Sequence, residues 1–151
     1  MKIPGYMNEI FKIVPVVLYF FVGIVSFVMA YKTLAAKKFL TFHEKAAGKS
    51  WDELDKSLKI VYSTILKISG LGFFVNALLL TVFPIMNYFK DETFVKFAIP
   101  IISLIFCFGL FLFNYSLYKQ TNADTPWKKS LMVIFIIFTE IMISLFPHSL
   151  S

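Results

Sequence analysis

Long apolar stretches without charged residues dominate this chain and leave it few possible folds. The stretch 13–31 has 19 residues and no charged side chain, which is long enough for a helix to cross the roughly 30 Å hydrocarbon core of a bilayer. Because only helices and closed barrels satisfy their backbone groups inside lipid, we predict an all-α integral membrane four-helix bundle, forming one domain over 1–151. The predicted spans are 13–31, 60–83, 94–118 and 130–146.

The composition supports a protein with several membrane spans. Hydrophobic residues make up 58% of the chain, the mean hydropathy is +0.76, and only 16% of residues are charged. The apolar fraction exceeds that of an average soluble domain, which is roughly half, and the charged fraction is below the usual value of about 25%. A cleaved signal peptide is the alternative for the first stretch, because Val28-Met29-Ala30 resembles a small-residue cleavage site.

The segment 32–59 is the one sizeable polar region, and its local signals predict a helical hairpin between the first two spans. Ser50 and Glu53 have the spacing of a capping box, and Gly48 suits the end of a preceding helix. Apolar residues on both sides of this turn recur at helical spacing, so that two stripes could pack together. The stripes are Tyr31, Ala35, Phe39, Phe42 and Ala46, and then Trp51, Leu54, Leu58, Val61 and Ile65.

Turn and proline signals predict the remaining helix ends. Pro84 is expected to close the second span, and Asn87–Glu92 to form a short polar turn. Thr125 suits the N-cap of the last helix, with Pro126 at its first position.

The distribution of lysines predicts the orientation in the membrane. Ten lysines fall in the two polar loops 32–59 and 119–129, whereas four fall at the opposite ends of the predicted spans. Positive residues are enriched in cytoplasmic loops. We therefore expect both of these loops to lie in the cytoplasm and both termini to lie outside.

Several classes of function lack sequence support. The chain has 15 lysines and no arginine, and since phosphate recognition favours the arginine fork, we predict no nucleic-acid partner. The single cysteine, Cys107, excludes an intrachain disulfide and a cysteine metal cluster. No serine–histidine–acid arrangement or glycine-rich phosphate loop is present.

Two charged residues inside predicted spans, Lys67 and Glu140, are candidates for an ion pair or a ligand site. A charge within the bilayer is costly and commonly faces a partner or a cavity. The alternatives are a structural ion pair, a lysine whose amine reaches the membrane surface, and a glutamate kept neutral by burial. Asn76 and Asn114 also lie inside spans, where hydrogen bonding between helices is the main interpretation and ligand contact the alternative.

The polar segment supplies a second group of candidates, for contact with a partner. One histidine cannot complete a metal site, which needs at least three converging ligands, so we predict neither a metal nor a cofactor. The predicted role of the histidine is to pack against or cap its neighbours. The group comprises His43, Glu44, Trp51 and Glu53.

The pattern His43-Glu44-x-Ala46-x-Gly48-Lys49-x-Trp51-x-x-Leu54, followed by Thr125-Pro126-Trp127, resembles small bacterial four-helix inner-membrane proteins of unknown function. The resemblance covers most of the chain. It implies a location in a bacterial inner membrane and no activity. The size and four-span layout are also similar to the membrane-associated eicosanoid and glutathione metabolism family. The arginines that this family uses for glutathione have no counterpart here.

These observations favour a non-enzymatic membrane module that binds a lipid or a partner protein, or associates with itself. One alternative is a small oligomeric transporter that uses Lys67 and Glu140. A further alternative is a membrane enzyme acting on a lipophilic substrate, with Glu140 or His43 as its acid–base group.

Overall fold

The structure of the chain, a computed structural model, describes residues 5–90 and 93–145, and all regular elements in these ranges are helices. The prediction of an all-α protein is therefore confirmed. The five helices are α1 (Gly5–Leu34), α2 (Thr41–Ala47), α3 (Lys56–Lys90), α4 (Thr93–Thr121) and α5 (Trp127–Leu145).

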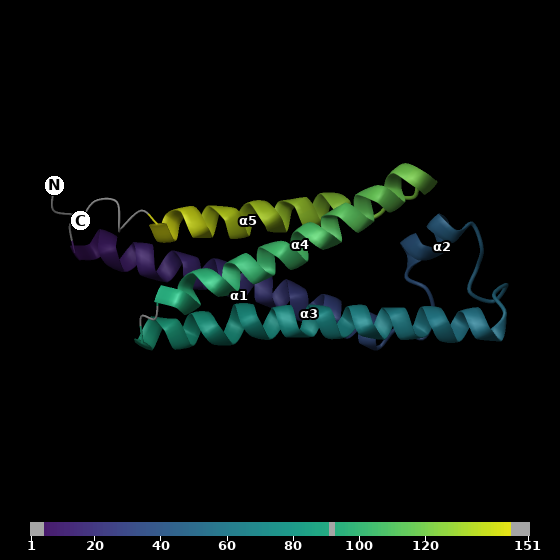
Figure 1. Cartoon of the computed structure of the whole chain (residues 1–151), viewed down its shortest axis with the longest axis horizontal. Coiled ribbons are helices and arrows are strands. Elements are labelled where there is room, and N and C mark those ends of the chain that lie inside the picture. Colours follow the sequence, from purple (N-terminus) through teal and green to yellow (C-terminus); the bar gives the residue numbers. More distant parts are fainter. Residues whose placement is uncertain (1–4, 91–92, 146–151) are drawn as a thin grey trace.

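The four long helices run up and down along one elongated body (Figure 1). α1 packs on α3 and on α5, and α4 packs on α5 and on α3. α1 begins and α5 ends at the same end of the body, whereas α2 lies at the other end, near the start of α3 and the end of α4 (Figure 1). The two polar loops thus share one end of the molecule.

One buried cluster joins the long helices. It contains residues from α1, α3, α4 and α5, and no side chain in it is more than 7% exposed. Burial of these apolar side chains holds the helices together. The members are Tyr19, Val22, Leu80, Cys107 and Ile137.

Small residues allow α1 and α3 to approach closely. A Cβ atom added at Gly23 would lie 2.5 Å from the Thr81 side chain, and one added at Gly70 would lie 2.7 Å from the Leu34 side chain. The Asn76 side-chain amide also donates a hydrogen bond to the Ser26 hydroxyl at 3.2 Å. The interpretation of Asn76 as a link between helices is therefore confirmed.

The helices extend beyond the predicted spans. α1 starts at Gly5 and α3 continues to Lys90, with Pro84 inside it. We predicted that Pro84 would close the second span. This prediction is wrong, because the helix continues beyond Pro84. A proline removes one backbone donor but is tolerated in apolar helices whose neighbours pack against the affected turn. Residues 91–92 of the predicted turn and position 146 of the last span lie outside the described residues.

The polar segment contains one short helix in place of the predicted hairpin. Gly48 ends α2 with φ +62°, as predicted, and the Ser50 N–H donates to the Glu53 carboxylate at 2.9 Å. The next helix nevertheless begins at Lys56 and not at Trp51. The reason is a second cap, because Asp55 accepts from the Leu58 N–H at 2.8 Å and from the Ser57 hydroxyl.

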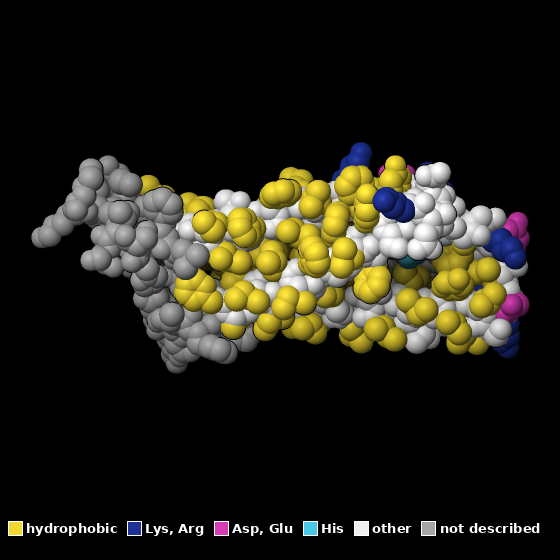
Figure 2. Space-filling view, turned by 45° about the horizontal axis from the view of Figure 1, so that its top comes forward, with side chains coloured by type: hydrophobic (Ala, Val, Ile, Leu, Met, Phe, Trp, Pro, Cys, Tyr) yellow, Lys and Arg dark blue, Asp and Glu magenta, His cyan; other side chains and the backbone are white. Residues whose placement is uncertain are grey.

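Apolar side chains cover the flank of the body, and charged side chains gather at the end that carries α2 (Figure 2). Three helical stretches among the described residues are long and apolar enough to cross a membrane, in α1, α3 and α4. α5 is not among them, since its 19 residues include Lys128, Lys129 and Glu140.

Candidate functional site

A cavity of about 570 Å³ lies beneath α2, at the end of the body where the polar loops meet. Its walls come from the last turns of α1, the first half of α3, the last half of α4 and the α2 segment. The volume is in the range of small-molecule sites, which are typically about 300–1,000 Å³. The wall is mostly apolar, with Met29, Leu66, Phe73, Leu110 and Leu117 among its residues.

Aromatic contacts of Phe39 hold α2 over this cavity. Phe39 is 6% exposed although it lies between helices. Its ring packs edge to face against Tyr62 of α3, with centroids 4.9 Å apart, and against Trp51 at 5.1 Å. α2 itself contacts α4. The short helix is thus fixed on both α3 and α4, as a cover over the gap between them.

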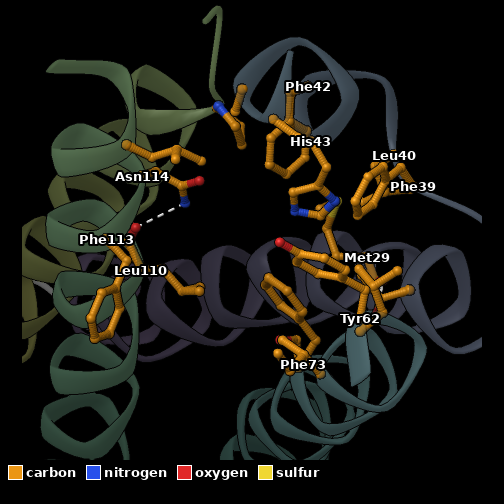
Figure 3. Close-up of a pocket in the computed structure, with 18 residues that line it drawn as sticks. Met29, Phe39, Leu40, Phe42, His43, Tyr62, Phe73, Leu110, Phe113 and Asn114 are labelled. Atoms are coloured by element: carbon orange, nitrogen blue, oxygen red, sulfur yellow. Dashed lines mark hydrogen bonds between the residues drawn. The ribbon is translucent and has the colours of Figure 1, made fainter. Parts of the chain in front are cut away.

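Five polar side chains line the cavity, and three of them are labelled in Figure 3. The five are Thr33, His43, Tyr62, Ser69 and Asn114. The His43 ring and the Tyr62 hydroxyl point into it from the side of α2 and α3, and Asn114 approaches from α4. The Asn114 amide donates to the Leu110 carbonyl at 2.8 Å, which leaves its side-chain oxygen as an acceptor. Nδ1 of His43 is buried without a hydrogen-bond partner among the described residues. A ligand could therefore be oriented by these groups.

Burial of His43 favours the neutral form of its imidazole. Burial lowers its pKa below the ordinary value of 6.5. Its ring lies 4.0 Å from that of Phe42 and 6.0 Å from that of Phe39, measured between centroids. The expectation that His43 packs against its neighbours is confirmed. In this state the side chain can donate one hydrogen bond and accept another.

The cavity opens onto the apolar flank of the molecule. Two of its lining residues are strongly exposed, Ile65 on α3 (51%) and Phe113 on α4 (77%). Figure 1 shows α3 and α4 diverging toward this end. An apolar molecule that lies against the flank could enter between these two helices.

The structure does not bring Lys67 and Glu140 together. Lys67 is exposed on α3, whereas Glu140 on α5 is fully buried. Neither carboxyl oxygen of Glu140 has a hydrogen-bond partner among the described side chains. The predicted ion pair is therefore not formed, because Leu66 and Gly70 occupy the face of α3 that is buried.

The other candidates of the polar segment have local roles. Trp51 packs on Phe39, Glu53 accepts from Ser50, and Glu44 is half-buried on α2. Asn114 lies at the cavity and bonds within its own helix, in contrast to the predicted link between helices.

Thr125 joins α4 to the start of α5 and does not cap α5. Its hydroxyl donates to the Asn114 backbone carbonyl at 2.8 Å, and the residue is 4% exposed. The Trp127 ring packs among the aromatic rings of α4. This end of α5 is therefore anchored beside the cavity, and Pro126 is one of the lining residues.

The sequence does not predict the cavity itself. Tyr62, Phe73 and Leu110 carry no local signal that separates them from other apolar residues of the spans, because the cavity results from the angle between α3 and α4. Comparison of the chain with protein family models, curated proteins and solved structures finds no match in any of the three.

Proposed function

We propose that this protein is a four-span membrane protein that binds a lipid with an anionic headgroup, its apolar chain held in the cavity beneath α2. The observation that supports this proposal is the position of the cavity. It has an apolar wall, an opening toward the apolar flank, and polar groups at the lysine-rich end.

A membrane location is supported by the outward-facing apolar surface. Only 33%, 29% and 22% of the residues in the most apolar stretches of α1, α3 and α4 are buried inside the protein. Soluble proteins rarely leave apolar surface of this extent in water. In our proposal α5, about 28 Å long by its 19 residues, is the fourth span and completes a four-helix bundle.

The lysine excess supports both the proposed orientation of the protein in the membrane and a negatively charged headgroup on the ligand. The loops 32–59 and 119–129 contain ten lysines and five acidic residues, an excess of five positive charges. Such an end belongs on the cytoplasmic side and attracts anionic headgroups by about 1 kcal/mol per lysine near the surface. Lys38 and Lys45 are exposed, and each directly precedes in the sequence a residue that lines the cavity, Phe39 and Ala46 respectively.

Binding without catalysis is the function that these groups support best. The polar groups that line the cavity are an imidazole, a phenol, a carboxamide and two hydroxyls, which suit hydrogen bonds to a headgroup. Binding of a partner protein, self-association, transport and enzymatic activity stay predictions from the sequence.

Native mass spectrometry of the detergent-solubilised protein tests the proposal, with phosphatidylglycerol and phosphatidylcholine added in matched amounts. We expect preferential retention of phosphatidylglycerol. Ser69→Phe places a ring at a lining position of the cavity and should reduce this retention, whereas Ile68→Phe, at a neighbouring position that does not line the cavity, should not. Lys38→Gln with Lys45→Gln should lower the preference more than Lys49→Gln with Lys56→Gln. Equal retention of both lipids by all variants would refute the proposal.

A further inference from the structure

Three buried hydroxyl and carboxyl side chains in the core have oxygen atoms without hydrogen-bond partners among the described residues. They are Tyr19 of α1, Ser103 of α4 and Glu140 of α5, and both carboxyl oxygens of Glu140 are unpartnered. Their side chains are 7%, 0% and 0% exposed, respectively. Native proteins leave few buried polar atoms unsatisfied. Several such oxygens on helices that pack together indicate a site for a ligand that the protein chain does not itself supply.

The packing places these groups at one level of the body. Cys107 and Ile137 belong to the same buried cluster as Tyr19. Ser103 precedes Cys107 by one turn on α4, and Glu140 follows Ile137 by about one turn on α5. Because α4 and α5 run in opposite directions (Figure 1), both steps lead toward the same end.

The surroundings of Glu140 provide no positive charge among the described residues. α1 and α4 are the helices that pack on α5. The buried titratable side chains that these two helices contribute to the cluster are Tyr19 and Cys107, and both are uncharged in their protonated forms. Partly buried apolar residues surround the cluster, Ile136 and Ile141 among them. A carboxylate in such surroundings is strongly disfavoured unless a cation neutralises it.

We infer that Glu140, with Tyr19 and Ser103, forms a site for a monovalent cation, either a proton or Na⁺, between α1, α4 and α5. The carboxyl group supplies the negative charge, and the two hydroxyl oxygens can orient toward a bound ion or hydrogen-bond to a protonated carboxyl. The site is separate from the lipid cavity, since Tyr19 and the cavity residue Met29 are ten residues apart on α1, about 15 Å along the helix.

The melting temperature of the full chain in detergent tests this inference, measured between pH 6 and pH 9 with Na⁺ or with choline as the only salt cation. A ligand that binds the folded state raises the melting temperature. If the ion is Na⁺, Na⁺ should raise the melting temperature at high pH in the wild type and lose this effect in Glu140→Gln. If the ion is a proton, the melting temperature should fall as the pH rises, independently of Na⁺, and Glu140→Gln should remove that fall.

Tyr19→Phe and Ser103→Ala should each reduce the cation-dependent shift, whereas Ser116→Ala, at an exposed position of the same helix as Ser103, should retain it. Identical dependence on pH and Na⁺ in the wild type and Glu140→Gln would overturn the inference. Since the glutamine side chain has nearly the shape of glutamate and no charge, the Glu140→Gln variant is expected to fold.

Discussion

The ring of Phe39, in the linker before α2, packs edge to face against the ring of Tyr62 on α3, with centroids 4.9 Å apart. The contact fixes a seven-residue helix that would be too short to be stable alone. It also closes one side of the cavity, because both residues line it. The Phe39 ring is therefore the contact that ties α2 to α3, in addition to the contacts of α2 with α4.

Replacement of Phe39 by alanine should release α2 from α3. Truncation of a buried phenylalanine costs about 3–5 kcal/mol, more than a short surface helix can compensate. Limited trypsin digestion would then cut faster after Lys45 and Lys49. Tyr31→Ala removes a similar ring at a site that is 75% exposed and serves as the control. Equal cleavage of the two variants would show that Phe39 does not hold α2.

The docking of α2 should weaken in acid through His43. Burial lowers the pKa of His43, so the docked state binds fewer protons than the released state once the pH falls below the ordinary histidine value of about 6.5. Docking is therefore favoured above that pH and is lost as the pH falls. The fluorescence of Trp51, recorded in a Trp127→Phe background, should shift to longer wavelength between pH 7 and pH 5. His43→Gln should abolish this shift, and a shift of the same size in that variant would contradict the assignment.

Close packing of α1 on α3 makes Gly70 sensitive to a single methyl group. A Cβ atom there would lie 2.8 Å from the Thr33 hydroxyl oxygen and 2.7 Å from Leu34 Cγ. We expect Gly70→Ala to lower the free energy of unfolding by about 1–3 kcal/mol. Gly109→Ala is the matched control, since a Cβ there meets no atom within 4 Å and alanine favours the helix by up to about 1 kcal/mol. Thermal unfolding in mild detergent compares them, and a Gly70→Ala variant as stable as Gly109→Ala would count against this packing.

The two polar loops should react from the same side of the membrane. Single cysteines at Asp52 and Asp124, both exposed, are expected to react with an impermeant maleimide only from the cytoplasmic face. The native Cys107 is 5% exposed and should stay unlabelled. Labelling of the two positions from opposite faces would rule out the proposed topology.

The sequence predicts the helices better than their ends or their contacts. The four long apolar stretches all form helices, because their length and lack of charge leave few alternatives. The predicted start of α3 is wrong. Ser50 and Asp55 can both cap the start of a helix, and the local sequence does not show which of these two positions, five residues apart, begins the long helix.

The candidate site is only partly predictable for a related reason. Glu140 and Lys67 are recognisable as charges in apolar stretches, but which face of α3 is buried depends on the fit of Gly70 against α1. That fit leaves Lys67 exposed. His43 is identified from the sequence, whereas its cavity depends on the divergence of α3 and α4, which involves residues far apart in the chain.

Photo-crosslinking tests the central claim most directly, with phosphatidylglycerol that carries a diazirine within its acyl chain. After irradiation of the protein in membranes, mass spectrometry of its peptides locates the adducts. We expect them at the cavity wall, on Phe73 and Leu110, with loss of these adducts in Ser69→Phe. Adducts distributed over exposed residues such as Ile105, and unchanged by Ser69→Phe, would contradict lipid binding beneath α2.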